Sequence, residues 1–410
     1  MKSWSRPAVP RLRGTGPLPS VYDSASDDII ETEPGEVASL YVCGITPYDA
    51  THLGHAATYL AFDTLIRLWL DAGVEVKYAQ NTTDVDDPLL ERAARDGVDW
   101  RQLAAEQTDL FRSDMEHLRI IPPDHYIAVT EVVDEIAGAV HELLAGGTAY
   151  PVESDVAAGE EIQSDLYFDS SADAKPWFLG QESRLERSDM LRFSAERGGD
   201  PNRPGKRDPL DPLLWRSVRP GDPSWDTVLG RGRPGWHIEC SVIALRFLPR
   251  PLTVSGGGAD LLFPHHEFSS GHASALTGEP FARAYVHSGM VGYEGDKMSK
   301  SLGNLVLVSK LVVGGADPGA IRLALLSHHY REDWEWTDDQ LDEATERLSR
   351  WGAWAKGATD EPDPFVDRLR EILSLDLDTP EAIAAIDEHL SEPATIQAVL
   401  AIDALLGLSL

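Results

Sequence analysis

The sequence predicts an α/β protein with a Rossmann-like, doubly wound parallel sheet, an insertion within it and a C-terminal helical bundle. Two observations predict the sheet: apolar runs at 38–43 and 74–79 suit buried parallel strands, and an amphipathic stretch of helical length joins them. A third observation predicts the bundle. From about Asp317 to the end, apolar residues recur at helical spacing, as at Leu341 and Leu348.

The elements follow in order from local sequence. The first strand ends in a turn, and the helix that follows runs from about Gly54 to Gly73, a residue that commonly ends helices. A stretch at 151–225 is rich in Gly, Pro, Asp and Arg, so we expect it to be irregular. The remaining expected elements are helices at 100–118 and 129–145, strands at 252–255 and 283–290, and a helix from about His266.

These elements divide the chain into four parts. We expect a Rossmann-like catalytic domain from residues 1–118 and 215–290, a connective insertion at 119–214, a linker at 291–345 and a helical bundle at 346–410.

Composition limits the partners. The 410 residues carry a formal net charge of −32, which argues against a broad nucleic-acid surface, because phosphate neutralisation needs clustered Lys and Arg. No apolar run has the length needed to cross a membrane, and the basic, proline-containing start at 1–13 lacks the apolar segment of a signal peptide. We therefore expect a cytoplasmic protein with no membrane or nucleic-acid partner, and a monomer.

Two motifs indicate phosphate chemistry. His52-Leu53-Gly54-His55 lies between the first strand and its helix, where free N–H groups and the helix dipole favour an anion. Lys297-Met298-Ser299-Lys300-Ser301 follows a strand, and its two lysines suit a clamp on pyrophosphate. The alternatives are two surface histidines at a helix start and a solvated basic loop.

The third set of residues contains the chain's two cysteines, Cys43 and Cys240. They are either two buried thiols or ligands of a shared metal, since a disulfide is disfavoured in the cytoplasm. His265 follows a glycine-rich strand end, and two thiolates with an imidazole are good Zn²⁺ ligands. Three protein ligands leave a fourth position for a substrate thiol.

The two phosphate motifs resemble the "HIGH" and "KMSKS" signatures of class I aminoacyl-tRNA synthetases. From about Leu40 to Asn304 the chain is similar to cysteinyl-tRNA synthetases, with matches at 41–44, 83–87, 234–240, 256–260 and 297–301. The resemblance implies a class I synthetase fold and activation of cysteine by ATP, with Mg²⁺. It places zinc ligands at Cys43, Cys240 and His265. The family's fourth ligand, a glutamate, falls at Ser269, so we expect three protein ligands.

A closer resemblance is to the mycothiol-pathway cysteine ligases, a paralogous family with a shortened C-terminus. It rests on residues 43–56, Glu196 to Pro201, and Phe268 after the His-His-Glu. It implies an AMP-forming acid–amine ligase that joins L-cysteine to glucosaminyl-inositol (1-D-myo-inosityl 2-amino-2-deoxy-α-D-glucopyranoside) through a cysteinyl adenylate. The alternative is a cysteinyl-tRNA synthetase. The few basic residues beyond residue 340 favour the ligase.

The same resemblance implies roles for individual residues. His52 and His55 stabilise the α-phosphate transition state, and Lys297 and Lys300 neutralise the pyrophosphate. Thr46 and Thr83 hold the carboxylate end of cysteine, and Trp236 lies against the amino acid. Other substrate and nucleotide contacts are expected from Gly44, Thr58, Asn81, Gly258, Ala259, Asp260 and Val291, with Asp260 a candidate for the ribose hydroxyls. Sequence alone names no general base, and Asp84, Asp86 and the glutamates near the metal are candidates.

Overall fold

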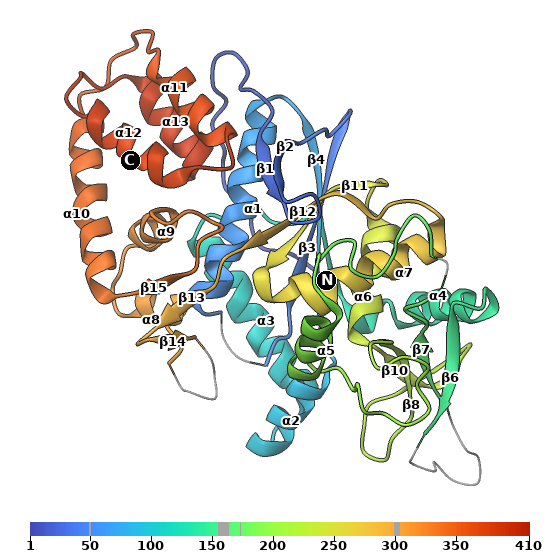
Figure 1. Ribbon diagram of the computed structural model, residues 1–410. Helices are drawn as coiled ribbons and strands as arrows, with labels where there is room; N and C mark the ends of the chain where they lie inside the picture. The colour runs from blue at the N-terminus through green and yellow to red at the C-terminus, as the bar shows by residue number, and fades with distance from the viewer. Residues whose placement is uncertain (49–50, 155–163, 173, 299–303) are drawn as a thin grey trace.

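A five-stranded parallel sheet forms the centre of the computed structural model (Figure 1). The structure describes residues 1–48, 51–154, 164–172, 174–298 and 304–410, with only the backbone of Asp296 and Lys297. The strand order β12–β11–β3–β4–β5 confirms the predicted doubly wound sheet. The strands are β3 (Val37–Ile45), β4 (Glu75–Thr82), β5 (His125–Ala128), β11 (Leu252–Gly258) and β12 (Ala282–Ser288).

Alternate side chains of β3 enter two separate hydrophobic cores. Leu40 and Val42 pack with α1 (Leu53–Asp71), whereas Tyr41 and Cys43 pack with α6 (Trp236–Phe247) and α7 (Glu267–Thr277). Both faces of the strand are buried, which explains why its sequence is a continuous apolar run. The sheet is therefore covered on both faces, and the chemistry of the site is left to the strand ends.

The stretch at 151–225, which we expected to be irregular, contributes strands to an antiparallel sheet, so that expectation was wrong for these strands. The strand order of this sheet is β6–β7–β8–β10–β9. Its strands are short and contain the same Gly, Pro and Arg residues that indicated loops, which hid them in the sequence. Their bounds are β6 (Ala149–Glu153), β7 (Ser164–Phe168), β8 (Leu213–Ser217), β9 (Trp225–Thr227) and β10 (Gly230–Pro234).

Four strands do not fit the predicted domain boundaries. β5 pairs with β4 in the parallel sheet although it follows residue 118. β9 and β10 belong to the antiparallel sheet although they follow residue 214, and β8 spans that boundary. In the chain, α2 (Asp87–Asp96) and α3 (Trp100–His117) lie between β4 and β5. α4 (Val133–Ala145) follows β5 after a short 3-10 turn, and α5 (Arg187–Glu196) lies between β7 and β8.

The C-terminal part is helical and lies on the opposite side of the parallel sheet from the insertion (Figure 1). It follows a small sheet, β14–β13–β15, of which Lys297 ends β14. No helix in the described part of the chain is both long and apolar enough to cross a bilayer. The elements are β13 (Val291–Tyr293), β14 (Asp296–Lys297), α8 (Val308–Val313), α9 (Pro318–Leu326), β15 (Trp334–Trp336), α10 (Asp338–Ala355), α11 (Phe365–Ser374), α12 (Thr379–His389) and α13 (Ile396–Leu406).

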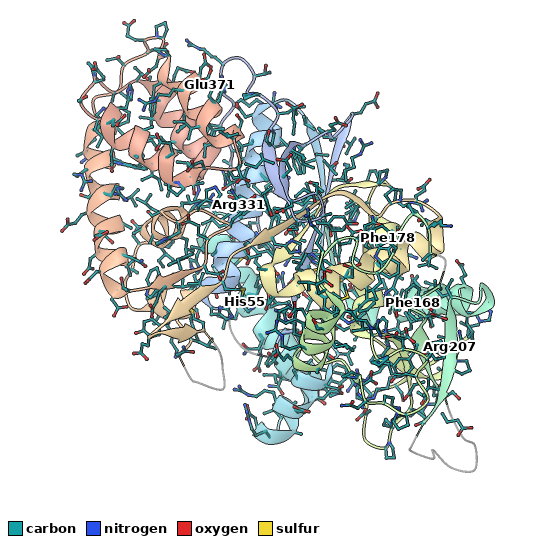
Figure 2. The ribbon with its side chains drawn as sticks, in the orientation of Figure 1. His55, Phe168, Phe178, Arg207, Arg331 and Glu371 are labelled. Atoms are coloured by element: carbon teal, nitrogen blue, oxygen red, sulfur yellow. The ribbon has the colours of Figure 1, made fainter. Side chains whose placement is uncertain are left out.

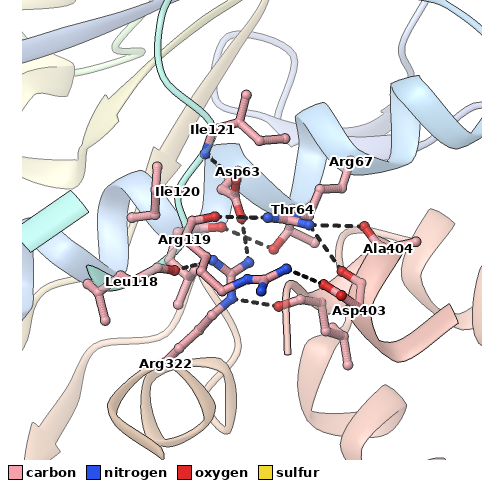
Figure 3. Close-up of polar contacts among 12 residues, drawn as sticks. Asp63, Thr64, Arg67, Leu118, Arg119, Ile120, Ile121, Arg322, Asp403 and Ala404 are labelled. Carbon is pink, nitrogen blue, oxygen red and sulfur yellow. Dashed lines mark hydrogen bonds and ion pairs between the residues drawn. The ribbon is translucent and has the colours of Figure 1, made fainter. Parts of the chain in front are cut away.

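A buried ionic cluster fastens this helical part to α1 (Figure 3). Asp63 accepts hydrogen bonds from Arg67 of the same helix and from Arg322 of α9. The two guanidinium groups also donate to backbone carbonyls near the end of α13, including those of Asp403 and Leu406. The charges and the last carbonyls of α13 are thus satisfied together in the core.

Candidate active site

The site lies where the strand order reverses. The chain leaves β3 through α1 towards β4, while β11 pairs with the other edge of β3, so the carboxyl ends of β3 and β11 border a crevice. A cavity of about 530 Å³ opens there. Figure 2 shows His55 between the helical part and the insertion.

At the end of β3, the backbone of Gly44 lies close to the backbone of Asn81. The Gly44 N–H donates to the Asn81 side-chain oxygen at 2.8 Å, and a Cβ on Gly44 would lie 1.6 Å from the Asn81 carbonyl oxygen. Only glycine fits this approach. The Asn81 amide donates in turn to the Thr83 hydroxyl at 3.1 Å. Asn81 therefore joins the ends of β3 and β4 from behind the cavity wall.

The two histidines of the first motif stand together at the start of α1. His52 is the N-cap residue, and its Nδ1 accepts the Gly54 N–H at 3.1 Å. The His55 ring lies over the His52 ring with centroids 3.9 Å apart. Both line the cavity beside the positive end of the helix dipole, an arrangement suited to a phosphate.

Cys43, Cys240 and His265 meet behind this cavity. Their ligand atoms all lie within 4.8 Å of one another, although the residues come from β3, α6 and the turn before α7. The two sulfur atoms are 3.8 Å apart, and His265 Nε2 is 3.2 Å from Cys240 Sγ. Two thiolates bound at about 2.3 Å to one tetrahedral ion would be separated by about 3.8 Å, so the residues fit a metal.

The surroundings orient the histidine. His265 Nδ1 lies 3.0 Å from His237 Nδ1, and its ring stacks near the Trp236 ring at 4.3 Å. A metal-binding histidine commonly places its second nitrogen in such a hydrogen bond. Ser269, at the position of the family's fourth ligand, donates its hydroxyl to the His237 carbonyl at 3.1 Å. The Ser269 hydroxyl is therefore hydrogen-bonded to the backbone rather than to one of the three candidate metal ligands.

Burial keeps Cys43 and His265 neutral unless a cation compensates it. Burial raises the pKa of the Cys43 thiol well above its usual range and lowers the pKa of His265 well below its own. A bound cation reverses this preference for the thiol, because it stabilises the thiolate. Burial also lowers the pKa of His237 to about 3, so that ring is neutral at physiological pH.

The structure brings most of the predicted residues to the cavity. Gly44, Thr46, Thr58, Trp236, Gly258, Asp260 and Val291 line it with His52, His55 and Cys43. Asn81 and Thr83 are buried next to the cluster, and Ala259 starts the short 3-10 turn after β11. The Lys297 backbone lies in β14, and Lys300 is outside the described residues. The roles assigned to all these residues remain predictions.

Sequence reasoning missed three neighbours of the cluster: His237, His266 and His287. His266 Nε2 lies 3.2 Å from Cys43 Sγ, and His266 Nδ1 lies 2.8 Å from His287 Nε2. The adjacency of His265 and His266 was the available signal. Nothing in the sequence indicated that His287, on a strand edge, would come next to them.

Hydrogen bonds of Arg197 and Glu267 join the insertion to the site. Arg197, within the segment 196–201, donates to the carbonyl oxygens of Asp260 and Phe263. Glu267 accepts the Trp177 indole N–H at 3.0 Å and two backbone N–H groups of the same loop. The insertion is therefore fixed to the turn that carries His265.

Comparison with known proteins assigns the family. A family model described as the class I tRNA synthetase (C) catalytic domain matches residues 29–346. The chain is 61% identical to the L-cysteine:1D-myo-inositol 2-amino-2-deoxy-alpha-D-glucopyranoside ligase of Clavibacter michiganensis subsp. michiganensis, covering 100% of this chain and 99% of that protein. It is 53% identical to the ligase of that name from Mycolicibacterium smegmatis, with 100% of both covered.

The chain belongs to this ligase family. Its fold is also that of synthetases of known structure. Mycobacterium tuberculosis methionyl-tRNA synthetase bound by methionyl-adenylate aligns with a TM-score of 0.59 at 17% identity, covering 89% of this chain and 83% of that one. The Agrobacterium radiobacter K84 agnB2 LeuRS–tRNA–LeuAMS complex aligns with a TM-score of 0.61 at 13% identity, covering 91% and 83%. The ligase family thus uses a class I synthetase scaffold, as the sequence predicted.

Proposed function

We propose that this protein ligates L-cysteine to the amine of glucosaminyl-inositol, consuming ATP and releasing AMP and pyrophosphate through a cysteinyl adenylate. One observation carries the proposal: Cys43, Cys240 and His265 meet at the wall of a cavity whose mouth holds His52 and His55. A place for a thiol beside a place for phosphates suits activation of cysteine. The names of the relatives supply the acceptor.

The metal in this proposal is Zn²⁺. Two cysteines and one histidine are a soft donor set that suits a zinc ion, and three protein ligands leave one position open. When bound, the ion supplies a Lewis-acid contact for the substrate's sulfur that a serine hydroxyl matches poorly. An apolar pocket alone separates such close analogues by only about 1–3 kcal/mol.

The protein's own groups act on the nucleotide. His52 and His55 donate to the α-phosphate as charge develops, and the helix dipole of α1 adds to their effect. Gly258, at the end of β11, and Asp260, in the 3-10 turn after it, border the same cavity and take the adenosine side. Lys297 and Lys300 neutralise the leaving pyrophosphate. The carboxylate of cysteine is the nucleophile, so positioning and charge stabilisation supply the rate.

In the second step a neutral amine attacks the adenylate. Asp84, Asp86 and the glutamates near the metal remain the candidates for the base, and we favour the two aspartates. Burial raises the pKa of both carboxyl groups, which makes them better proton acceptors than ordinary aspartates. Asp84 accepts hydrogen bonds from the Thr130 N–H and hydroxyl, whereas Asp86 accepts one from the Asp87 N–H. Asp86 is the less constrained of the two.

Contacts in the helical part support the small acceptor over tRNA. The side chains of Arg347 and Arg350 pair with Asp387, Arg368 pairs with Glu388, and Arg370 pairs with Asp71. Cations that are already paired within an acidic protein offer little to a phosphate backbone.

The test is a reconstituted reaction. Purified protein with ATP, L-cysteine and glucosaminyl-inositol should release AMP and form the cysteinyl amide, and omission of any substrate should abolish the amide. Cysteine-dependent ATP–pyrophosphate exchange should occur without the acceptor. Serine in place of cysteine is the control. Efficient charging of tRNA with cysteine, without amide formation, would overturn the proposal.

We also propose that the enzyme works as a cytoplasmic monomer. The net charge of −32 supports a protein that stays dissociated through mutual repulsion. Light scattering at physiological ionic strength should give the mass of one chain, and a dimer mass would contradict this.

A further inference from the structure

An N-terminal hairpin, whose first strand precedes the family match that begins at residue 29, reaches the metal-site region. It consists of β1 (Ser20–Asp23) and β2 (Asp28–Glu31). β1 packs against β12, where the Asp23 carboxylate accepts the Tyr285 N–H and the Ser24 N–H donates to the Tyr285 carbonyl. These contacts fix the backbone of Ser24 beside the end of β12.

From this position Ser24 begins a continuous row of side chains that ends at Cys43. Ser24 Oγ lies 2.8 Å from His287 Nδ1. His287 Nε2 lies 2.8 Å from His266 Nδ1, and His266 Nε2 lies 3.2 Å from Cys43 Sγ. The imidazole rings of His266 and His287 are more than nine-tenths buried, so water has little access to them.

The chemistry at one end sets the direction of every hydrogen bond. A metal-bound thiolate only accepts, so His266 Nε2 must carry the proton that it donates to Cys43. A neutral imidazole has one donor and one acceptor; His266 Nδ1 therefore accepts from His287 Nε2–H, and His287 Nδ1 needs a donor. The Ser24 hydroxyl supplies it. Ser24 is the member of the row that fixes the tautomer of both histidines.

We propose that Ser24 and His287 are positioning residues that hold His266 in the tautomer that donates to the Cys43 thiolate. This inference rests on the zinc site of the proposed function. The donated hydrogen bond stabilises the negative charge on sulfur, and the row fixes the Cys43 side chain opposite Cys240. The N-terminal hairpin is then part of the cysteine-binding apparatus.

The experiment measures zinc binding by the full-length protein, with competition against a chromogenic chelator. His287→Ala should weaken zinc binding by about 10-fold, the usual effect of losing a partner behind a ligand. Ser24→Ala should weaken it by a smaller factor, and Ser24→Thr, which keeps the hydroxyl, should restore it. In the cobalt-substituted protein, the thiolate-to-metal absorption band should shift in both alanine variants.

Ser26→Ala is the matched control. Ser26 lies on the same hairpin turn, is exposed, and contacts the protein through its backbone N–H to Asp23 and its carbonyl to Arg184. It should bind zinc as the wild type does. Wild-type affinity and spectrum in folded Ser24→Ala and His287→Ala would overturn this inference alone, and if His287→Ala does not fold the Ser24 series decides. Wild-type protein that binds no zinc would overturn the proposed metal and this inference together.

Discussion

Two buried polar clusters in this protein follow opposite rules. Around Asp63, the charges of Arg67 and Arg322 and several backbone carbonyls satisfy one another without any further partner (Figure 3). Around Cys43, two thiols and several imidazoles are packed together, and burial disfavours the charged forms of Cys43, His265 and His266. A cluster whose charges are all paired can stay buried, and removing one partner from it is costly. A cluster of neutral donors with no cationic side chain among them suits a bound cation.

The substitution with the largest expected effect on the cluster around Cys43 is Cys240→Ala. We expect loss of the bound zinc, and a fall in the preference for cysteine over serine to the roughly 10–200-fold that an apolar pocket provides. Metal analysis and ATP–pyrophosphate exchange with each amino acid measure the two effects. Ser269→Ala is the control: its hydroxyl bonds to the His237 backbone, so zinc should be retained. Zinc loss in this control would instead make Ser269 part of the metal site.

Substitutions in the cluster around Asp63 should lower the stability of the fold. Asp63→Asn leaves two buried guanidinium groups without their carboxylate, and we expect a loss of about 3–5 kcal/mol in the free energy of unfolding. Asp403→Asn, which breaks the Arg119–Asp403 pair with side chains 33% and 18% exposed, should cost about 1 kcal/mol or less. Urea unfolding compares them. Equal effects would mean that burial does not separate the two pairs.

Asp114 is another buried carboxyl group, and the pH dependence of stability should distinguish it from Asp63. Burial raises the pKa of Asp114 to about 7, and the Thr51 hydroxyl opposes part of that rise. Since the folded pKa lies above the unfolded value of about 4, wild-type stability falls as pH rises from about 4 to 7. Asp114→Asn should therefore be more stable than the wild type at pH 8, and the advantage should vanish below about pH 4. A constant difference across this range would contradict the prediction.

The contribution of Asp63 to stability should depend on pH in the opposite direction to that of Asp114. Burial alone raises its pKa, but Arg67 and Arg322 outweigh burial and lower it. Its stabilising contribution is present above the unfolded pKa of about 4 and is lost as pH falls further.

The parallel sheet and the helices around it were predictable because their sequence patterns are strong. β3 is apolar on both faces, and α1 carries a continuous apolar stripe ending at a glycine. The antiparallel sheet was not predictable, since strands such as Gly230–Pro234 are held by pairing with neighbours rather than by local preference. Tertiary pairing overrode composition there.

Site residues could be predicted from the sequence where the residue type is rare and has few chemical roles. Cysteines are rare in this chain, so Cys43 and Cys240 stood out, and the structure confirms that they meet with His265. Ser24 and His287 have ordinary local sequences, and their relevance depends on how a hairpin packs against a strand edge far along the chain. Such contacts have no local signature.

The arginine contacts with α13 also affect the order in which the molecule is completed. The carbonyls of Asp403, Ala404 and Leu406 are the last partners of Arg67 and Arg322 to be synthesised. A ribosome-bound chain therefore carries two cations in an unfinished interior until this helix has emerged. α13 must be synthesised before the half that holds the parallel sheet can close, so proteins truncated before this helix are expected to be cleared by proteases rather than to accumulate as smaller enzymes.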